Sequence, residues 1–235
     1  MARILQWNVN SPDLTVTGDL SFYGDNGSPG YFGFASGEIS VQGDVFYDQA
    51  SLGVGHVYTA THGTIRFVGT GNQEIHSLDN SGRIARVVID KTSGTVSPAA
   101  GTNDLGFSIL ELESGVLILP TNFSLYYYHE NYNGILFSNK SGTTLNSSST
   151  NFNIVQGSVG GNVTRIVDLE VPVVVNSLTL DNVSNSIARQ YSLDIVDQSI
   201  TTTDFTSLGS PGPGYRINIL TCLLYTSPSP RDRSI

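Results

Sequence analysis

The chain has 235 residues and a formal net charge of −9, with 39% hydrophobic and only 13% charged residues. A typical globular domain has about a quarter charged residues, and here Gly, Ser, Thr and Asn replace them, as strand-and-turn proteins require. The acidic balance excludes a nucleic-acid partner and disfavours an anionic membrane surface, and no apolar stretch reaches the ~18 residues of a membrane span. We therefore expect an all-β protein.

The first predicted elements are strands that repeat a short phrase. Residues 1–13 are expected to form an irregular segment or cap. The phrase Leu14–Leu20 recurs 25 residues later as Ile39–Val45, and Gly37–Gly43 recurs 26 residues later as Gly63–Gly69. A strand phrase that recurs at a fixed period of this size indicates a solenoid, because each unit is too small to bury its apolar face alone.

The repeated phrases also predict which residues stack. Inward-facing residues of a parallel solenoid lie over their equivalents one coil away, at about 4.8 Å. We therefore expect Ile39 over Ile65 and Val41 over Phe67, and coils of about 20–26 residues across residues 14–221. A β-sandwich and a β-propeller, which also contain repeated short strands, are the alternative folds.

Two segments close together in the sequence carry a family resemblance. Residues 63–75 read Gly-Thr-Ile-Arg-Phe-Val-Gly-Thr-Gly-Asn-Gln-Glu-Ile, and residues 89–96 read Ile-Asp-Lys-Thr-Ser-Gly-Thr-Val. This pattern resembles bacterial surface β-solenoids, the filamentous-haemagglutinin-like and pectin-lyase-like right-handed parallel β-helices of large exported proteins. The resemblance is clearest over residues 14–119, and it implies a right-handed coil and a location outside the cell or at its surface.

Later segments continue the pattern less regularly. Leu110–Leu119 is expected to form a strand, a Ser-Gly corner and a second strand. Gly115 is expected to lie two coils after Gly63, because their separation is twice the step between Gly37 and Gly63. Weaker copies follow at Gly134–Phe137 and Ser177–Val183.

The two ends of the chain require separate treatment. Residues 222–232 resemble the translation of a sequencing-library adapter, so we expect residues 222–235 to be a non-native tail and the natural reading frame to have been cut near Thr221. The single cysteine, Cys222, belongs to this tail, so disulfide frameworks and thiolate metal sites are not expected in the native part. At the other end, Met1–Trp7 lacks the apolar region of a signal peptide.

No metal or cofactor site is predicted from the sequence. Asp19 and Asp44, each after a glycine, would stack their carboxylates at one edge, but Ca²⁺ needs six to eight oxygen ligands, so we interpret both as corner residues. The four histidines lack the short spacing of zinc ligands, and we expect them to be surface residues. They are His56, His62, His76 and His129.

A cluster of tyrosines is the one candidate binding site. Alternation along a strand would place Tyr126 and Tyr128 on one face and Tyr127 on the other. At least one ring of this group, which also includes Tyr132, would then be exposed and able to stack on a sugar. The alternative is an aromatic ladder inside a coil.

The expected function is structural. We expect a non-catalytic, adhesive β-solenoid segment of a larger exported bacterial surface protein, with glycans, cell-surface or matrix components and adjoining repeats as partners. No catalytic residues are predicted, because the basic residues are few and no group of acids is linked to them by a motif. A phage tail-fibre or tailspike segment is the first alternative, and a carbohydrate-active β-helix enzyme is the second.

Overall fold

The structure is a computed structural model in which the chain forms an all-β parallel solenoid. It describes residues 13–23, 30–32, 37–48, 50–52, 63–77, 83–102, 105–119, 124–127, 134–147, 149–156, 163–182, 190–208 and 216–221. The tail beyond Thr221 lies outside these residues. Within them, no helix has the length and apolar character needed to cross a membrane.

The described residues form nineteen strands between Leu14 and Thr221. In the first half they are β1 (Leu14–Val16), β2 (Leu20–Tyr23), β3 (Gly30–Phe32), β4 (Glu38–Val41), β5 (Val45–Asp48), β6 (Ala50–Leu52), β7 (Thr64–Phe67), β8 (Gln73–Ser77), β9 (Arg83–Pro98) and β10 (Gly106–Ile118). In the second half they are β11 (Ser124–Tyr127), β12 (Gly134–Asn139), β13 (Thr144–Asn146), β14 (Asn151–Gln156), β15 (Val163–Leu169), β16 (Val173–Asn182), β17 (Gln190–Val196), β18 (Ile200–Leu208) and β19 (Arg216–Thr221).

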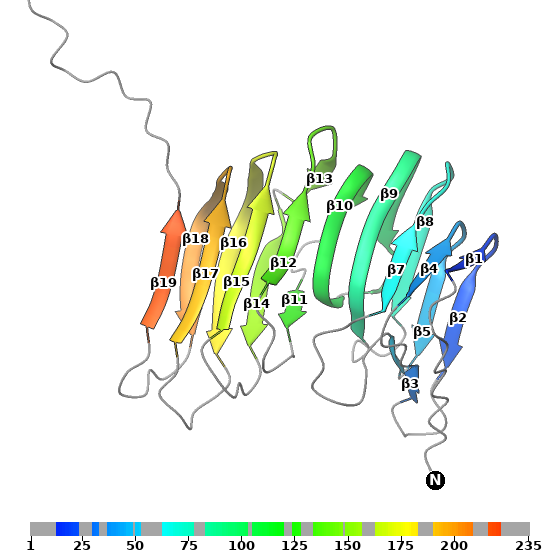
Figure 1. Ribbon diagram of the computed structural model, residues 1–235, viewed down its shortest axis with the longest axis horizontal. Coiled ribbons are helices and arrows are strands. Elements are labelled where there is room, and N and C mark those ends of the chain that lie inside the picture. The colour runs from blue at the N-terminus through cyan, green and yellow to red at the C-terminus, as the bar shows by residue number, and fades with distance from the viewer. Residues whose placement is uncertain are drawn as a thin grey trace, which may run out of the picture.

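The strands stack in chain order, each parallel to its neighbour. The main sheet has the path β1-β4-β7-β9-β10-β12-β15-β17-β19, and a second sheet has the order β11-β14-β16-β18. Figure 1 shows the strands side by side, with the colour running from blue to red along the stack. Parallel neighbours far apart in sequence require a crossover between them, and in this fold the rest of each coil supplies it.

The predicted stacking of the first coils is confirmed. Leu14 pairs with Ile39, Ile39 with Ile65, and Val41 with Phe67. These partners are separated by the same steps as the repeated phrases of the sequence. The apolar ladder follows because every second residue of these short strands points inward, and Ile39, Val41, Ile65 and Phe67 are all buried.

The coil length then changes along the chain. Ile65 pairs with Val87 and Val87 with Leu110, so these two coils are shorter than the coil between Ile39 and Ile65. Leu110 pairs with Phe137 and Phe137 with Val167, so the next two coils are longer than it. These two coils therefore exceed the expected length, while the parallel strand pairing continues through them.

One predicted equivalence is wrong for this reason. Thr64 pairs with Arg86 and Arg86 with Ile109, so the position two coils after Gly63 comes before Ile109 and is not Gly115. Gly115 instead lies at the corner of β10, where its backbone has a φ of 92°. The expected strand, corner and strand are present there as one bent strand with irregular register on both sides of Ser114.

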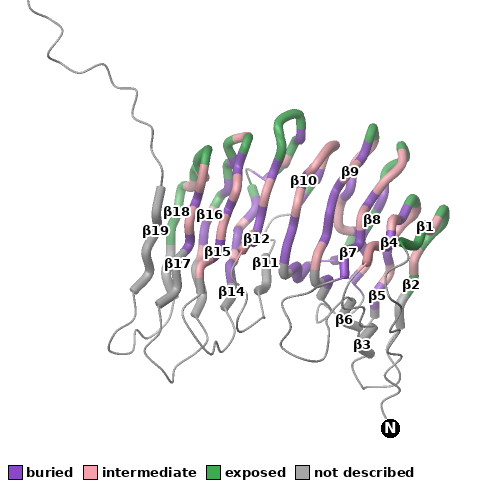
Figure 2. Tube along the Cα trace, viewed as in Figure 1, coloured by how far each residue is buried: buried purple, intermediate pink, exposed green. Residues whose placement is uncertain are grey.

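The core is a continuous apolar column inside the stack. Buried residues follow the inward side of successive strands, shown in purple in Figure 2, while many of the turns at the upper strand ends are exposed. Aliphatic residues dominate this column, with larger rings such as Tyr47, Phe67 and Phe137 among them. Burial of each such side chain stabilises the fold by about 1.5–3 kcal/mol, and stacking shares that burial between neighbouring coils.

Candidate functional site

Two short strands in successive coils position a group of polar side chains on the outer face of the solenoid. Asp44 directly precedes β5, and Glu74 and His76 lie on β8. Along β8 the alternation is strict: Gln73, Ile75 and Ser77 are buried, so the two residues between them point outward. The outward positions are therefore the ones that can meet solvent or a ligand.

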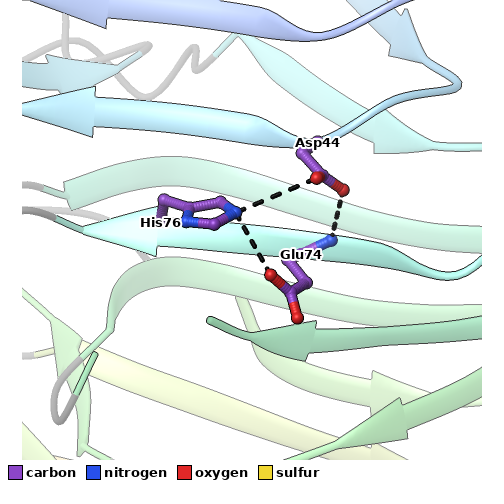
Figure 3. A group of neighbouring side chains, drawn as sticks. All are labelled: Asp44, Glu74 and His76. Carbon is purple, nitrogen blue, oxygen red and sulfur yellow. Dashed lines mark hydrogen bonds and ion pairs between the residues drawn. The ribbon is translucent and has the colours of Figure 1, made fainter. Parts of the chain in front are cut away.

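The register of β5 and β8 brings these side chains together. Val45 pairs with Ile75 and Phe46 with His76, which places Asp44 beside Glu74. The Glu74 backbone N–H donates to Asp44 Oδ1 at 2.7 Å. Figure 3 shows the Asp44, Glu74 and His76 side chains converging on the same point.

Both carboxylates face the same imidazole nitrogen. His76 Nε2 lies 3.3 Å from Glu74 Oε2 and 3.8 Å from Asp44 Oδ2, as drawn in Figure 3. This nitrogen is buried, and it makes no hydrogen bond with the described residues. The distances suit an ion pair if the imidazole is protonated, and they equally suit a cation held between the three groups.

Three further contacts hold the group in place. The imidazole stacks on the Phe46 ring, with 4.1 Å between the ring centroids and 15° between the planes. The Asp44 backbone N–H donates to Asp19 Oδ1 at 2.9 Å, and the Gly43 N–H donates to the Gly18 carbonyl at 3.1 Å. Asp19 and Asp44 are thus stacked corner residues, as the sequence predicts.

Sequence reasoning missed this group because of one long corner. More residues separate Asp44 from Glu74 than separate Val41 from Phe67, although both pairs are neighbours across the same two coils. The extra residues lie in the corner that precedes β8. The step from Val41 to Phe67 would place Thr70 opposite Asp44 instead, and only an alignment of Val45 with Ile75 could have indicated the true neighbours.

Two polar residues of the segments that carry the family resemblance, Gln73 and Lys91, form hydrogen bonds inside the coil. Gln73 Nε2 donates to the carbonyls of Val41 and Gly43 at 3.0 and 2.6 Å. Lys91 Nζ donates to Gln73 Oε1 and lies 3.5 Å from the Val68 carbonyl. Burial lowers the pKa of Lys91, and its position among amide groups gives it a structural role.

A charged ladder crosses the outer face of the main sheet. Arg66 on β7 pairs with Glu38 at 2.8 Å, Asp90 at 3.1 Å and Glu113 at 2.8 Å, from three other strands. Burial acts to lower the pKa of Arg66, but the hydrogen bonds and charges of Glu113 and Glu38 outweigh it and raise that pKa. Arg66 is therefore a permanent cation that links four strands.

A second acidic group lies further along the stack. Burial raises the pKa of Asp168, and the Asp197 and Glu170 carboxylates raise it further by charge repulsion. Asp197 has a φ of 67°, in the left-handed region that Asp tolerates better than most residues. The Asp168 carboxyl is thus shifted toward its neutral form, which reduces repulsion within the group.

The tyrosine cluster is only partly within the described residues. Tyr126 and Tyr127 end β11, while Tyr128 and Tyr132 lie outside the described residues, as do His56, His62 and His129. Glycan contact by this cluster stays a prediction. No family model, curated protein or solved structure matches the chain.

Proposed function

We propose that the protein is a non-catalytic structural and adhesive segment of a larger bacterial surface protein, exported to the outside of the cell. The observation that carries this proposal is that polar side chains of the protein bind groups on neighbouring coils. Arg66 bridges carboxylates from three other strands, and Gln73 binds backbone carbonyls of the preceding coil. These contacts join coils to one another, which is what a rigid rod requires.

The same contacts weigh against hydrolysis or elimination chemistry on this face. A glycosidase needs two carboxyl groups about 5–9.5 Å apart that flank a bound sugar. Here Glu38 and Glu113 are both held by Arg66, and Arg86 pairs with Glu111 at 2.9 Å. Carboxylates neutralised in this way are poorly placed to act as a general acid or base.

The proposed partners are glycans, other cell-surface or matrix components, and adjoining repeats of the same protein. Support for glycans comes from the tyrosine cluster in the sequence, since aromatic rings stack well on the apolar face of sugars. The acidic charge of the chain keeps such a surface soluble.

Glycan binding is tested with the purified chain on an array of bacterial and host polysaccharides. We expect saturable binding and no release of new reducing ends or unsaturated products from the bound polysaccharide. Tyr126→Ala and Tyr127→Ala form a matched pair, because alternation predicts that only one of them removes an exposed ring. Steady product release that is lost when a carboxylate is substituted would instead favour the enzyme.

The biological setting is tested by sequencing the source locus past both apparent ends. An upstream signal peptide with further repeats and a downstream sorting or translocator domain are the expected result. Tail, baseplate or lysis genes next to the reading frame would favour the phage tail fibre.

A further inference from the structure

We propose that Asp44, Glu74 and His76 form a binding site for one zinc-type divalent transition-metal ion on the outer face of the solenoid. The three side chains come from two successive coils, so the ion would bridge β5 and β8. The site is independent of the adhesive role proposed above, because its evidence is the local geometry of these residues.

The donor set matches the preferences of zinc. Imidazole nitrogen and carboxylate oxygen are both ordinary zinc ligands, and three protein ligands with one open position are typical of exchangeable or catalytic zinc. The imidazole disfavours Ca²⁺ and Mg²⁺, which prefer oxygen ligands throughout. Two carboxylates beside a neutral imidazole also supply the two negative charges that a divalent ion needs.

The distances are close to those of a tetrahedral site. Two ligand atoms bound to Zn²⁺ at about 2.0–2.1 Å and at tetrahedral angles lie about 3.3–3.4 Å apart. His76 Nε2 is 3.3 Å from Glu74 Oε2 and 3.8 Å from Asp44 Oδ2, and one ligand atom from each residue lies within 4.8 Å of the other two. Small rotations of the exposed Glu74 side chain would complete the geometry.

The ligand side chains are also oriented by contacts with groups that do not bind the ion. Asp44 accepts the Glu74 N–H through Oδ1, which leaves Oδ2 directed at the imidazole. The Phe46 ring fixes the plane of His76. Such supporting contacts reduce the freedom that the ligands lose on binding, and they tune metal affinity by about 10- to 100-fold in known sites.

His76 Nε2 is the inner ligand atom of the group. It is buried and makes no hydrogen bond with the described residues, and the Glu74 and Asp44 carboxylate oxygens lie beside it at 3.3 and 3.8 Å; an ion between the three groups would satisfy all of them at once. The side of the group that faces away from the imidazole remains accessible, since the Glu74 and Asp44 side chains are 49% and 32% exposed. An ion can therefore enter from solvent and bind to the buried nitrogen.

The test is a calorimetric titration of the untagged full chain with Zn²⁺. We expect one ion per chain, with affinity reduced at least about 10-fold in Glu74→Gln and in His76→Gln, since losing a ligand costs at least as much as losing a supporting contact. The matched control variant replaces the other histidines and the cysteine of the chain, and it should retain the wild-type affinity. These substitutions are at His56, His62, His129 and Cys222.

A thermal melt supplies the second readout. Because the ion would join two coils, saturating Zn²⁺ should raise the Tm of the wild type and of the control variant but not that of His76→Gln, and Ca²⁺ should leave all three unchanged. If His76→Gln does not fold, Glu74→Gln decides, because Glu74 is half exposed and its loss is tolerable. Absence of Zn²⁺ binding, or binding that disappears only in the control variant, would overturn the proposal and leave the group as an ion pair.

Discussion

Corner glycines determine how closely successive coils can approach. Gly94, in the Ser-Gly-Thr-Val part of the motif, has a φ of 75°, and a Cβ there would lie 2.4 Å from the Gly71 carbonyl oxygen of the preceding coil. Gly101 has a similar φ of 88° but nothing within 4 Å of its Cβ position. A comparison of the two positions therefore separates two effects of adding a Cβ. Both positions share the left-handed backbone strain, and Gly94 adds the close contact between coils.

Replacement of Gly94 by alanine should destabilise the fold more than replacement of Gly101. Both variants carry the left-handed strain of about 1–2 kcal/mol, and Gly94→Ala adds an overpacking cost of about 1–3 kcal/mol because a backbone atom must move. Urea denaturation measures the difference. Equal losses for the two variants would mean that the coils do not meet at Gly94.

The buried Lys91 amine should make stability depend on pH in the alkaline range. Its pKa lies below the ordinary 10.5 because of burial. Between the lowered pKa and 10.5, the unfolded chain binds more protons than the folded chain, so this residue's contribution to the free energy of unfolding rises with pH. Below the lowered pKa, the contribution is constant.

The measurement compares wild type with Lys91→Met by urea denaturation from about pH 7 to about pH 10.5. Tyrosines and other lysines titrate in both proteins, and their effects cancel in the difference. The unsatisfied Gln73 oxygen in the variant adds only a constant offset. We expect the difference to move in favour of wild type as the pH rises. A shift in favour of the variant would show that pairing raises the pKa of Lys91.

Among the elements, the strands of the main sheet are joined by unequal charged contacts. Arg66 meets three carboxylates with its side chain only 21% exposed, whereas among the described residues Arg86 pairs with one carboxylate, Glu111, with its side chain 40% exposed. An exposed pair contributes about 0.2–1 kcal/mol. Loss of Arg66 removes the cation that Glu38, Asp90 and Glu113 share, while Lys140 Nζ remains 3.9 Å from Glu113 Oε1.

We therefore expect Arg66→Met to lower the free energy of unfolding by about 1–3 kcal/mol and Arg86→Met by less than about 1 kcal/mol. Screening should reduce the Arg66 effect as salt is raised toward about 1 M, where the Debye length is about 3 Å. Denaturation of both variants at low and high salt measures this. A larger loss for Arg86→Met would contradict the role of Arg66 as the link between strands.

The strands were predictable from the sequence where coil length was constant. Ile39 over Ile65 follows from alternation and a shared glycine-bounded phrase. The neighbours of Asp44 did not follow, because extra residues in one corner shift β8 relative to β5 without changing the inward pattern. The roles of Gln73 and Lys91 could not be predicted either. The sequence does not distinguish a polar side chain that hydrogen-bonds to backbone groups inside a corner from one that lies on the surface.

The whole molecule is a stack in which register alone decides which outer side chains meet. The inner column needs only apolar residues at alternate positions, so it tolerates both the short coil from Ile65 to Val87 and the long coil from Phe137 to Val167. The outer face is more demanding, because a change of one residue in the corner before β8 would move Glu74 and His76 together away from Asp44. The parallel register between successive coils is therefore the central claim on which the stacked core and the proposed metal site depend.

Disulfide trapping between coils tests that register most directly. Glu74 pairs with Ser97 of the next coil, and parallel neighbours about 4.8 Å apart are within the Cα separation of about 4.4–6.8 Å that a disulfide requires. In a Cys222→Ser background, Glu74→Cys with Ser97→Cys should crosslink on mild oxidation. Glu74→Cys with Thr95→Cys should not, because it is displaced two positions along the strand. Crosslinking of the second pair in place of the first would contradict the solenoid register.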